Sequence, residues 1–190
     1  MADTAIRVQP SLAPASPAAV PWMSLVPPAT RLLLHGDGAA RRAMASVWCN
    51  FSEQACRAVV AGQRATLWLG PDEYLLLGPV SDSAPDNVAA LEQALGGIPH
   101  ALVDVSHRQI ALQLSGPHAA TILNGGCPLD LSIQEFPVGM CTRTVFSKAD
   151  IVLWRIANDA FHVEVWRSFT GYVTGLLREI GREFQSPDST

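Results

Sequence analysis

Two stretches of this chain share one pattern, a pair of apolar runs on either side of a short polar turn. The first, "TLWLGPDEYLLLGP" at 66–79, has Pro71 at its turn, and the second, "IVLWRIANDAFHVEVWR" at 151–167, turns at Asn158–Asp159. Apolar runs around turn-forming residues are typical of β-hairpins. A helical pattern follows each hairpin, at 86–97 and from about Ser168. The sequence therefore predicts an α+β fold of two pseudo-repeated ββα-type units with mostly antiparallel sheets.

Capping residues and apolar stripes mark the predicted helices. Asp86 is placed to cap the helix at 86–97, and two glycines follow at its end. A short helix is predicted within 115–126, with Pro117 at its first position. One further strand is predicted at 42–51, "RAMASVWCNF". The buried stripe predicted for the last helix consists of Phe169, Tyr172, Val173, Leu176, Leu177, Ile180 and Phe184.

The segment "VDVSHRQIALQL" at 103–114 changes the face on which its apolar residues lie. Successive side chains of a strand point to opposite sides, so residues of equal parity share a face. Val103 and Val105 are odd-numbered, whereas the later apolar positions are Ile110, Leu112 and Leu114. The backbone must therefore shift its phase between 105 and 110, through a bulge or a tight bend.

Four reactive side-chain types lie at this phase shift, from Asp104 to Arg108. If the segment is extended, Ser106 and His107 point to opposite sides and do not form the hydrogen bond that a nucleophile and its base need. The chain also has no G-x-S-x-G elbow. We interpret Ser106, His107 and Arg108 as a corner between two strands and not as a hydrolase site.

Prolines dominate the front of the chain. Six of them fall within residues 10–28, a density that is incompatible with a helix or with the interior of a sheet. We predict an extended Pro-rich N-terminal arm at 1–30, draped over a neighbouring chain because it carries apolar residues such as Trp22; disorder up to about residue 20 is the alternative. Residues 31–184 are predicted to form a single α+β domain of two halves, about 31–98 and 99–184. Residues 185–190 are a C-terminal tail.

The composition favours a chain that works with partners. Apolar residues make up 48% of the sequence and charged residues only 16%, which leaves little charge for a fully solvated surface; a genome rich in Ala, Arg and Pro codons would give the same balance. The net charge of −4 argues against nucleic-acid binding, and no apolar run is long enough to cross a membrane. We find no secretory signal at the start of the sequence. The cysteines show no zinc spacing, which is expected of free thiols in the cytoplasm; they are Cys49, Cys56, Cys127 and Cys141.

The remaining polar and aromatic candidates have weak patterns. The glycines of "HGDGAAR" at 35–41 do not make a dinucleotide fingerprint. The isolated histidines have no ligand spacing, and His162 is interpreted as a face residue of a strand. Trp154 and Trp166 are interpreted as core or interface anchors. Three arginines in or beside strands either line one anion-binding groove or form interfacial ion pairs. The three arginines are Arg143, Arg155 and Arg167. The isolated histidines without ligand spacing are His35, His100 and His118.

Four segments, taken in this order, carry a resemblance to a known family. They are "LVDVSHRQIALQLSGP", "GGCPLDL", "FPVGMCTRT" and "AFHVEVWRSFTGYVTGLL". From about Trp22 to Phe184 the chain resembles the gamma subunit of bacterial heterotetrameric sarcosine oxidase, which is similar in fold to the folate-binding domain of aminomethyltransferases. "DVSH" is shared with the folate-dependent aminomethyltransferases, whereas "GCPLDL" and "VEVWRSF" are more specific.

The resemblance implies partners and a reaction. The implied complex contains alpha, beta and delta subunits and oxidises sarcosine to glycine with O2, releasing H2O2. With tetrahydrofolate the methyl carbon leaves as 5,10-methylenetetrahydrofolate. In that family FAD, FMN, NAD, zinc and tetrahydrofolate belong to the other subunits. The resemblance therefore implies that this chain has no catalytic, cofactor-binding or metal-binding residues of its own.

The sequence departs from the aminomethyltransferases at one hairpin. Those enzymes typically carry a G-G-x-x-D-D element, in which a carboxylate serves folate chemistry. The corresponding stretch here, "TVFSKADIVLWRI" at 144–156, lacks the glycines and keeps only Asp150, which is interpreted as a turn residue. We expect a non-catalytic structural subunit. The alternative is a stand-alone folate-binding protein, either an aminomethyltransferase or an iron–sulfur repair protein, although "GGCPLD" shares only Gly-Cys with the K-G-C-Y-x-G-Q element of the latter.

Overall fold

A computed structural model describes residues 20–83 and 85–184. Its strands form two five-stranded sheets in which every neighbouring pair is antiparallel. The first sheet, in spatial order, contains β3 (Ala58–Ala61), β4 (Arg64–Gly70), β5 (Glu73–Gly78), β2 (Thr30–Gly36) and β6 (His100–Asp104). The second contains β1 (Met23–Leu25), β7 (Gln109–Ser115), β10 (Ala160–Trp166), β9 (Ala149–Ala157) and β8 (Cys141–Phe146). The predicted α+β class with antiparallel sheets is confirmed.

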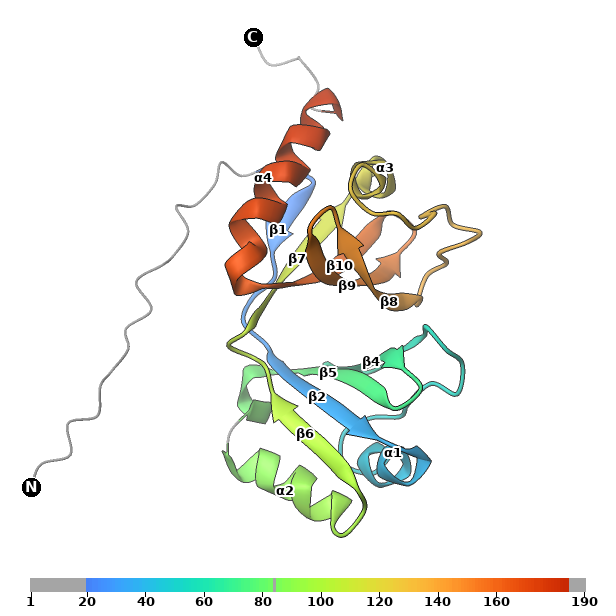
Figure 1. Cartoon of the computed structure of the whole chain (residues 1–190), viewed down its shortest axis with the longest axis vertical. Coiled ribbons are helices and arrows are strands. Elements are labelled where there is room, and N and C mark those ends of the chain that lie inside the picture. The colour runs from blue at the N-terminus through green and yellow to red at the C-terminus, as the bar shows by residue number, and fades with distance from the viewer. Residues whose placement is uncertain (1–19, 84, 185–190) are drawn as a thin grey trace, which may run out of the picture.

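The helices lie on the outer faces of the two sheets, so that the molecule has four layers (Figure 1). Those on the first sheet are α1 (Gly38–Ala45) and α2 (Pro85–Leu95), and those on the second are α3 (Ala119–Asn124) and α4 (Thr170–Gly181). Three short 3-10 helices complete the elements: η1 (Val80–Ser83), η2 (Arg167–Phe169) and η3 (Arg182–Phe184). Each half thus has a hairpin followed by a helix, as the repeated pattern predicts.

Three hydrophobic clusters correspond to the three boundaries between these layers. One lies beneath α1 and α2, one beneath α3 and α4, and the third between the two sheets. In β5, Tyr74 and Leu76 belong to the first cluster, while Leu75 and Leu77 belong to the cluster between the sheets. A strand that is covered on both faces needs a continuous apolar run, which explains "YLLL" in β5.

The predicted phase shift is the place where the chain passes from one sheet to the other. β6 pairs with β2 in the first sheet, and β7 pairs with β1 and β10 in the second. Residues 105–108 form the turn between them. The predicted division of the domain at 98/99 needs correction, because β6 belongs to the first sheet. The two halves meet at 105–108.

The N-terminal segment also differs from its prediction. Residues 1–19 and 185–190 lie outside the described residues, but β1 lies within the predicted arm and pairs with Leu112–Leu114 of β7. Trp22 is buried, and its ring packs against Gly181 of α4, where an added Cβ would come within 2.3 Å of it. From Val20 onwards the described part of the arm is therefore a component of the second half, held there by its apolar side chains.

The strand predicted at 42–51 is wrong. Gly38–Ala45 is the helix α1, followed by a turn. The Asp37 carboxylate accepts hydrogen bonds from the Ala39 and Ala40 N–H groups at 2.8 and 3.2 Å, which caps the helix. A capping Asp before an Ala- and Arg-rich segment is a helix signal that outweighs the apolar residues after it.

The other helices lie where they were predicted, but two of them start differently. α2 begins at Pro85, so Asp86 lies inside its first turn and does not cap it, and α3 begins at Ala119, two residues after Pro117. Leu91 and Leu95 of α2 are buried, and Gly96, with φ of 54°, ends that helix in the left-handed conformation. In α4 the stripe is buried through Val173 and Leu177, whereas Phe169 and Tyr172 at its start are exposed.

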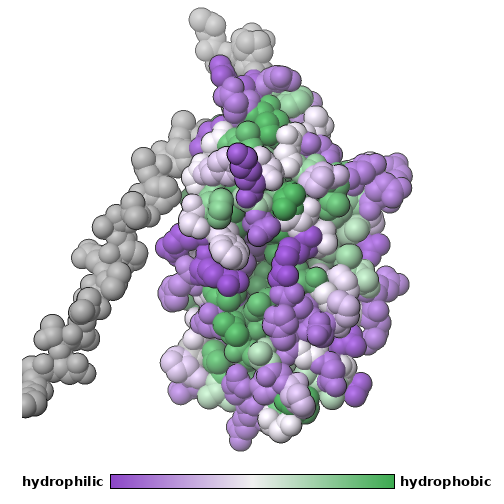
Figure 2. Space-filling model, in the orientation of Figure 1, coloured by the Kyte–Doolittle hydropathy of each residue, from purple (hydrophilic) through white to green (hydrophobic). Residues whose placement is uncertain are grey.

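Hydrophobic residues also reach the surface. Figure 2 shows a hydrophobic patch at the waist of the molecule, between the two halves, with hydrophilic residues around it. Within residues 20–83 and 85–184, no helix combines the length and the hydrophobicity needed to cross a bilayer.

Candidate functional site

The Ser106–His107–Arg108 cluster lies at the corner between the sheets. The Ser106 hydroxyl accepts a hydrogen bond from the Arg31 backbone N–H at 2.9 Å, and the Ser106 backbone N–H donates to the Asp104 carboxylate at 2.8 Å. His107 is exposed, and its carbonyl accepts a hydrogen bond from Nε of Arg167 at 3.1 Å. These contacts fasten the turn to β2 and to the start of the last helix. They support the interpretation of this segment as a corner.

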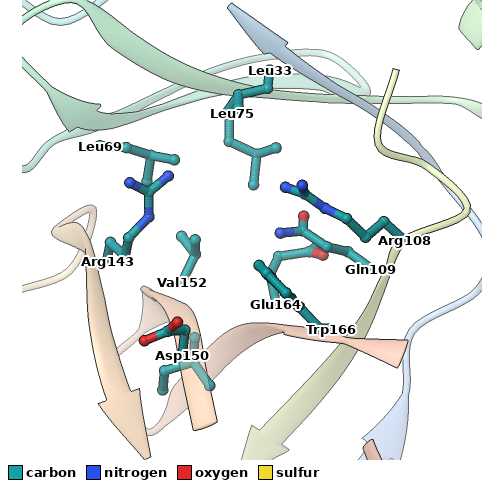
Figure 3. A pocket seen from close by; sticks show the side chains of 11 residues that line it. Leu33, Leu69, Leu75, Arg108, Gln109, Arg143, Asp150, Val152, Glu164 and Trp166 are labelled. Atoms are coloured by element: carbon teal, nitrogen blue, oxygen red, sulfur yellow. The ribbon is translucent and has the colours of Figure 1, made fainter. Parts of the chain in front are cut away.

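A cavity of about 230 Å³ lies beside this corner, between the two sheets (Figure 3). Leucines of the first sheet form one wall, and the end of β10 together with the β8–β9 hairpin forms the other. Arg108 and Gln109 reach into it from the corner. The structure therefore brings together several residues that the sequence analysis considered separately. They are Arg108, Arg143, Asp150 and Trp166.

Arg143 connects the two sheets at one side of this cavity. It belongs to β8, and both of its terminal nitrogens donate to the carboxylate of Glu73 in β5, one of them at 2.9 Å. The hydrogen bonds and charge of Arg143 hold the pKa of Glu73 below its ordinary value, in spite of partial burial. Arg143 therefore forms an ion pair within the chain, and not the interfacial ion pair that was considered from the sequence.

Asp150 is the second residue of β9, directly after the turn of the β8–β9 hairpin. It is exposed and lines the cavity. Its position next to a turn agrees with the sequence interpretation, but it is paired as a strand residue with Val145. The sequence alone did not show that Asp150 borders the same cavity as Arg108.

A buried charge network lies deeper between the sheets. Nε of Arg31 in β2 donates to Oε2 of Glu164 in β10 at 2.6 Å, and Nε2 of His162 lies 2.8 Å from Oε1 of the same carboxylate. The side chains of Arg31 and Glu164 are only 3% and 0% exposed. Burial alone would raise the pKa of Glu164, but His162 and Arg31 together hold it below its ordinary value. This carboxylate stays ionised and links the two halves.

His162 lies on a face of a strand, as expected from the sequence, whereas Glu164 and Arg31 were not predicted as members of a site. A signal was present in "FHVEVW", because His162 and Glu164 lie two residues apart and share a strand face. An acid between two valines in an apolar strand needs a partner, since an unpaired charge is rarely buried. The cation that pairs with it, Arg31, lies 133 positions away in the sequence.

The three strand arginines do not share one groove. Arg155 is buried and donates to the carbonyls of Leu131, Phe136 and Asn158, with its guanidinium over the Phe161 ring. Arg143 lies at the cavity, and Arg167 lies at the corner. Of the two alternatives left open for these arginines, a single anion-binding groove is therefore wrong.

Cysteines and histidines show structural contacts. His100 accepts or donates hydrogen bonds with the Ile98 carbonyl and Glu92, and His118 stacks on Phe184. All four cysteines are free thiols, and burial raises the pKa of Cys141 to about 12. Among residues 20–83 and 85–184 there is no group of three or more His, Cys, Asp or Glu side chains that could hold a metal ion.

Arg108, Gln109 and Asp150 line the cavity with polar groups that take no part in the ion pairs and hydrogen bonds described above. The Arg108 guanidinium lies 5.0 Å from the centre of the Trp166 ring and has no carboxylate partner among the described side chains. Gln109 is only 9% exposed, and its Oε1 has no hydrogen-bond partner within residues 20–83 and 85–184. The cavity thus presents one free cation, one buried acceptor and the exposed Asp150 carboxylate, with neither a paired nucleophile and base nor a metal cluster among the described residues.

Two antiparallel sheets packed face to face, with helices outside both, form a four-layer α+β domain. The structure is similar to the aminomethyltransferase T of the glycine cleavage system from Bartonella henselae, with a TM-score of 0.62 at 13% identity over 82% of this chain and 44% of that one. At this level of identity the likeness concerns the fold alone.

The sequence match is more specific. The model of the "Sarcosine oxidase, gamma subunit family" matches residues 36–183, and the chain belongs to this family. A sarcosine oxidase subunit gamma from an Arthrobacter species is 35% identical over 123 residues, which are 65% of this chain and 59% of that relative. The match therefore spans less than two thirds of the relative's length. A chain in the structure of heterotetrameric sarcosine oxidase from Corynebacterium sp. U-96, in complex with pyrrole 2-carboxylate, gives a TM-score of 0.79 at 28% identity, over 88% of this chain and 87% of that one.

Proposed function

We propose that this chain is the gamma subunit of a heterotetrameric sarcosine oxidase and that it serves the complex as a structural subunit. The observation that carries the proposal is the match to a chain of such an oxidase over 88% of this one, joined to membership of the gamma subunit family. Its partners would be the alpha, beta and delta subunits, in the cytoplasm. The complex would oxidise sarcosine to glycine with O2, giving H2O2 and, with tetrahydrofolate, 5,10-methylenetetrahydrofolate.

In this proposal FAD, FMN, NAD, zinc and tetrahydrofolate are held by the other subunits. The inter-sheet cavity itself is too small to hold any of the organic cofactors, because its volume of about 230 Å³ is below the roughly 300–1,000 Å³ of pockets for drug-sized ligands. It does not fit a flavin, a dinucleotide or a folate. The described residues also offer no cluster of metal ligands that would fit zinc.

The structural role is supported by what the polar side chains do. Ser106 holds the corner to β2, Arg143 pairs with Glu73 across the sheets, and Glu164 is enclosed by Arg31 and His162. Each of these groups joins two parts of the fold.

Co-expression tests the proposal. The chain, carrying an affinity tag, is produced together with the alpha, beta and delta chains of the same organism, and the purified material is analysed by size-exclusion chromatography with light scattering. The proposal predicts a complex with one copy of each chain and with sarcosine-dependent H2O2 release. A chain that elutes alone, with the three others assembled and active without it, would contradict the proposal.

Folate binding separates this role from a stand-alone folate protein. The isolated chain is titrated with a reduced folate in a calorimeter, with the assembled complex as the positive control. The expected result is heat of binding from the complex and none from the chain. Micromolar binding by the chain alone would contradict the structural role.

A further inference from the structure

A second hollow lies at the waist of the molecule, on the outside of the corner. It has a volume of about 610 Å³ and is bounded by the β1–β2 linker, η1, the corner 105–108 and the start of the last helix. We call this hollow the waist groove. The corner residues Ser106 and His107, which the sequence analysis singled out, form part of its wall.

The groove is apolar and open to solvent. Leu25, at the end of β1, and Val80, in η1, are 55% and 57% exposed, although both are large apolar side chains. Pro27 and Pro28 in the linker have no backbone N–H to offer. An occupant would therefore not be held as an additional β-strand. It would be held by its side chains, as in interfaces where an apolar residue fills a pocket.

The charges of the groove define its occupant further. Arg167 lines it and uses only Nε within the protein, toward the His107 carbonyl; its two terminal nitrogens have no carboxylate partner among the described residues. None of the residues that line the groove is acidic. Arg31, the other arginine of the wall, is already paired with Glu164. The free cation at the edge of an apolar hollow is complementary to a carboxylate beside an apolar side chain.

We propose that the waist groove docks a companion subunit, which inserts an apolar side chain between Leu25 and Val80 and places a carboxylate against Arg167. This inference rests on the proposed function, because it requires that the chain assembles with other subunits. It adds the surface on which they meet and the chemistry of the segment that binds there.

The test uses two valines of equal exposure. Val80 in the groove and Val60 on the edge strand β3 are both 57% exposed, so that Val80→Asp and Val60→Asp introduce the same change at different places. Each variant, tagged, is co-expressed with the companion chains, and the dissociation constant of the purified complex is measured. Val80→Asp should weaken association by at least about tenfold, as for loss of a central interface contact, and Val60→Asp should leave it unchanged. Circular dichroism of each isolated variant confirms that it is folded.

Arg167 gives a second, independent readout. In the wild type, added salt should weaken association, because a charge pair crosses the interface. Arg167→Gln should reduce this salt dependence and weaken association by about threefold to thirtyfold at low salt. This variant tests the groove even if Val80→Asp fails to fold.

The outcomes separate this inference from the proposed function. A wild-type chain that does not assemble overturns both. If the wild type assembles, and Val80→Asp and Arg167→Gln bind as tightly as Val60→Asp, only the proposal that the waist groove docks a subunit is overturned. Equal loss in all three variants also overturns it, since the effect would not be local. An isolated wild-type chain that is a dimer, made monomeric by Val80→Asp, would assign the groove to a second copy and overturn the companion as its occupant.

Discussion

The buried pair of Arg31 and Glu164 allows the sharpest prediction about stability. It connects β2 of the first sheet to β10 of the second with an N–O distance of 2.6 Å, and both side chains are withdrawn from water. Glu164→Gln preserves the shape of the side chain but leaves the Arg31 guanidinium without its carboxylate. Removing one partner of a buried pair costs about 3–5 kcal/mol, because the remaining charge is uncompensated. That is a large share of the roughly 5–15 kcal/mol by which domains are stable.

A double variant separates this charge effect from packing. In Arg31→Met/Glu164→Leu both charges are gone and apolar side chains of similar volume occupy the site. The free energy of unfolding should then recover by about 2 kcal/mol or more relative to Glu164→Gln, since apolar replacements of a buried pair are often neutral. The remaining cost comes from His162, which loses its carboxylate partner in both variants.

Urea unfolding at pH 7, followed by tryptophan fluorescence, measures these free energies. Tryptophans report on both halves of the fold: Trp48 and Trp68 in the first, and Trp22, Trp154 and Trp166 in the second. The control is Glu179→Gln, which removes an exposed ion pair with Arg182 at 3.1 Å and should cause no measurable change. The reasoning is refuted if Glu164→Gln is as stable as this control, or if the double variant is less stable than Glu164→Gln.

The pH dependence of the same variant has a defined sign. The pKa of Glu164 is lowered on folding, so its ionised form stabilises the protein at pH values above its ordinary pKa. That contribution disappears as the pH falls through the lowered pKa of the folded state. The difference in unfolding free energy between wild type and Glu164→Gln should therefore be full at pH 7 and shrink in acid.

Two further predictions concern helix packing and thiol reactivity. Gly181→Ala should destabilise the fold by about 1–3 kcal/mol, because its Cβ would lie 2.3 Å from the Trp22 ring. Gly175→Ala on the same helix is the control, since its Cβ meets no atom within 4 Å and the change should be neutral or stabilising. Thermal unfolding compares the two variants, and equal stability would contradict the packing of Trp22 on Gly181. Iodoacetamide at pH 8 should modify the partly exposed Cys56 well before Cys141, whose thiol is buried with a pKa of about 12. Mass spectrometry of the digested protein gives the order of modification, and modification of Cys141 before Cys56 would refute the prediction.

The elements that the sequence predicts correctly are those with local signals. Both hairpins have their turns and their apolar runs within about 17 residues of each other, and α2 carries its end signal in Gly96. The corner was predictable for the same reason, because the change of parity between Val105 and Ile110 is visible in the segment itself. At 42–51 a local signal was present in Asp37 and was outweighed in the prediction by Val47 and Trp48.

The features that the sequence did not predict depend on distant partners. β1 is only three residues long, and its pairing with β7 joins positions about ninety residues apart. Arg143 and Glu73 lie 70 positions apart, and Arg31 and Glu164 lie 133 apart. Periodicity identifies the face on which such a residue lies, but not the side chain that it meets across two sheets. For that reason the cavity and the waist groove emerge only from the folded chain.

Native mass spectrometry of the assembled oxidase tests the central claim, a structural subunit without a cofactor of its own, most directly. The complex is purified with its cofactors and dissociated stepwise in the gas phase, and the mass of the released chain is compared with the 20.3 kDa of the sequence. The account predicts that this chain leaves at its bare polypeptide mass, while flavin, nicotinamide dinucleotide, zinc and folate remain with the other subunits. A released chain that carries the mass of any of them would contradict the account.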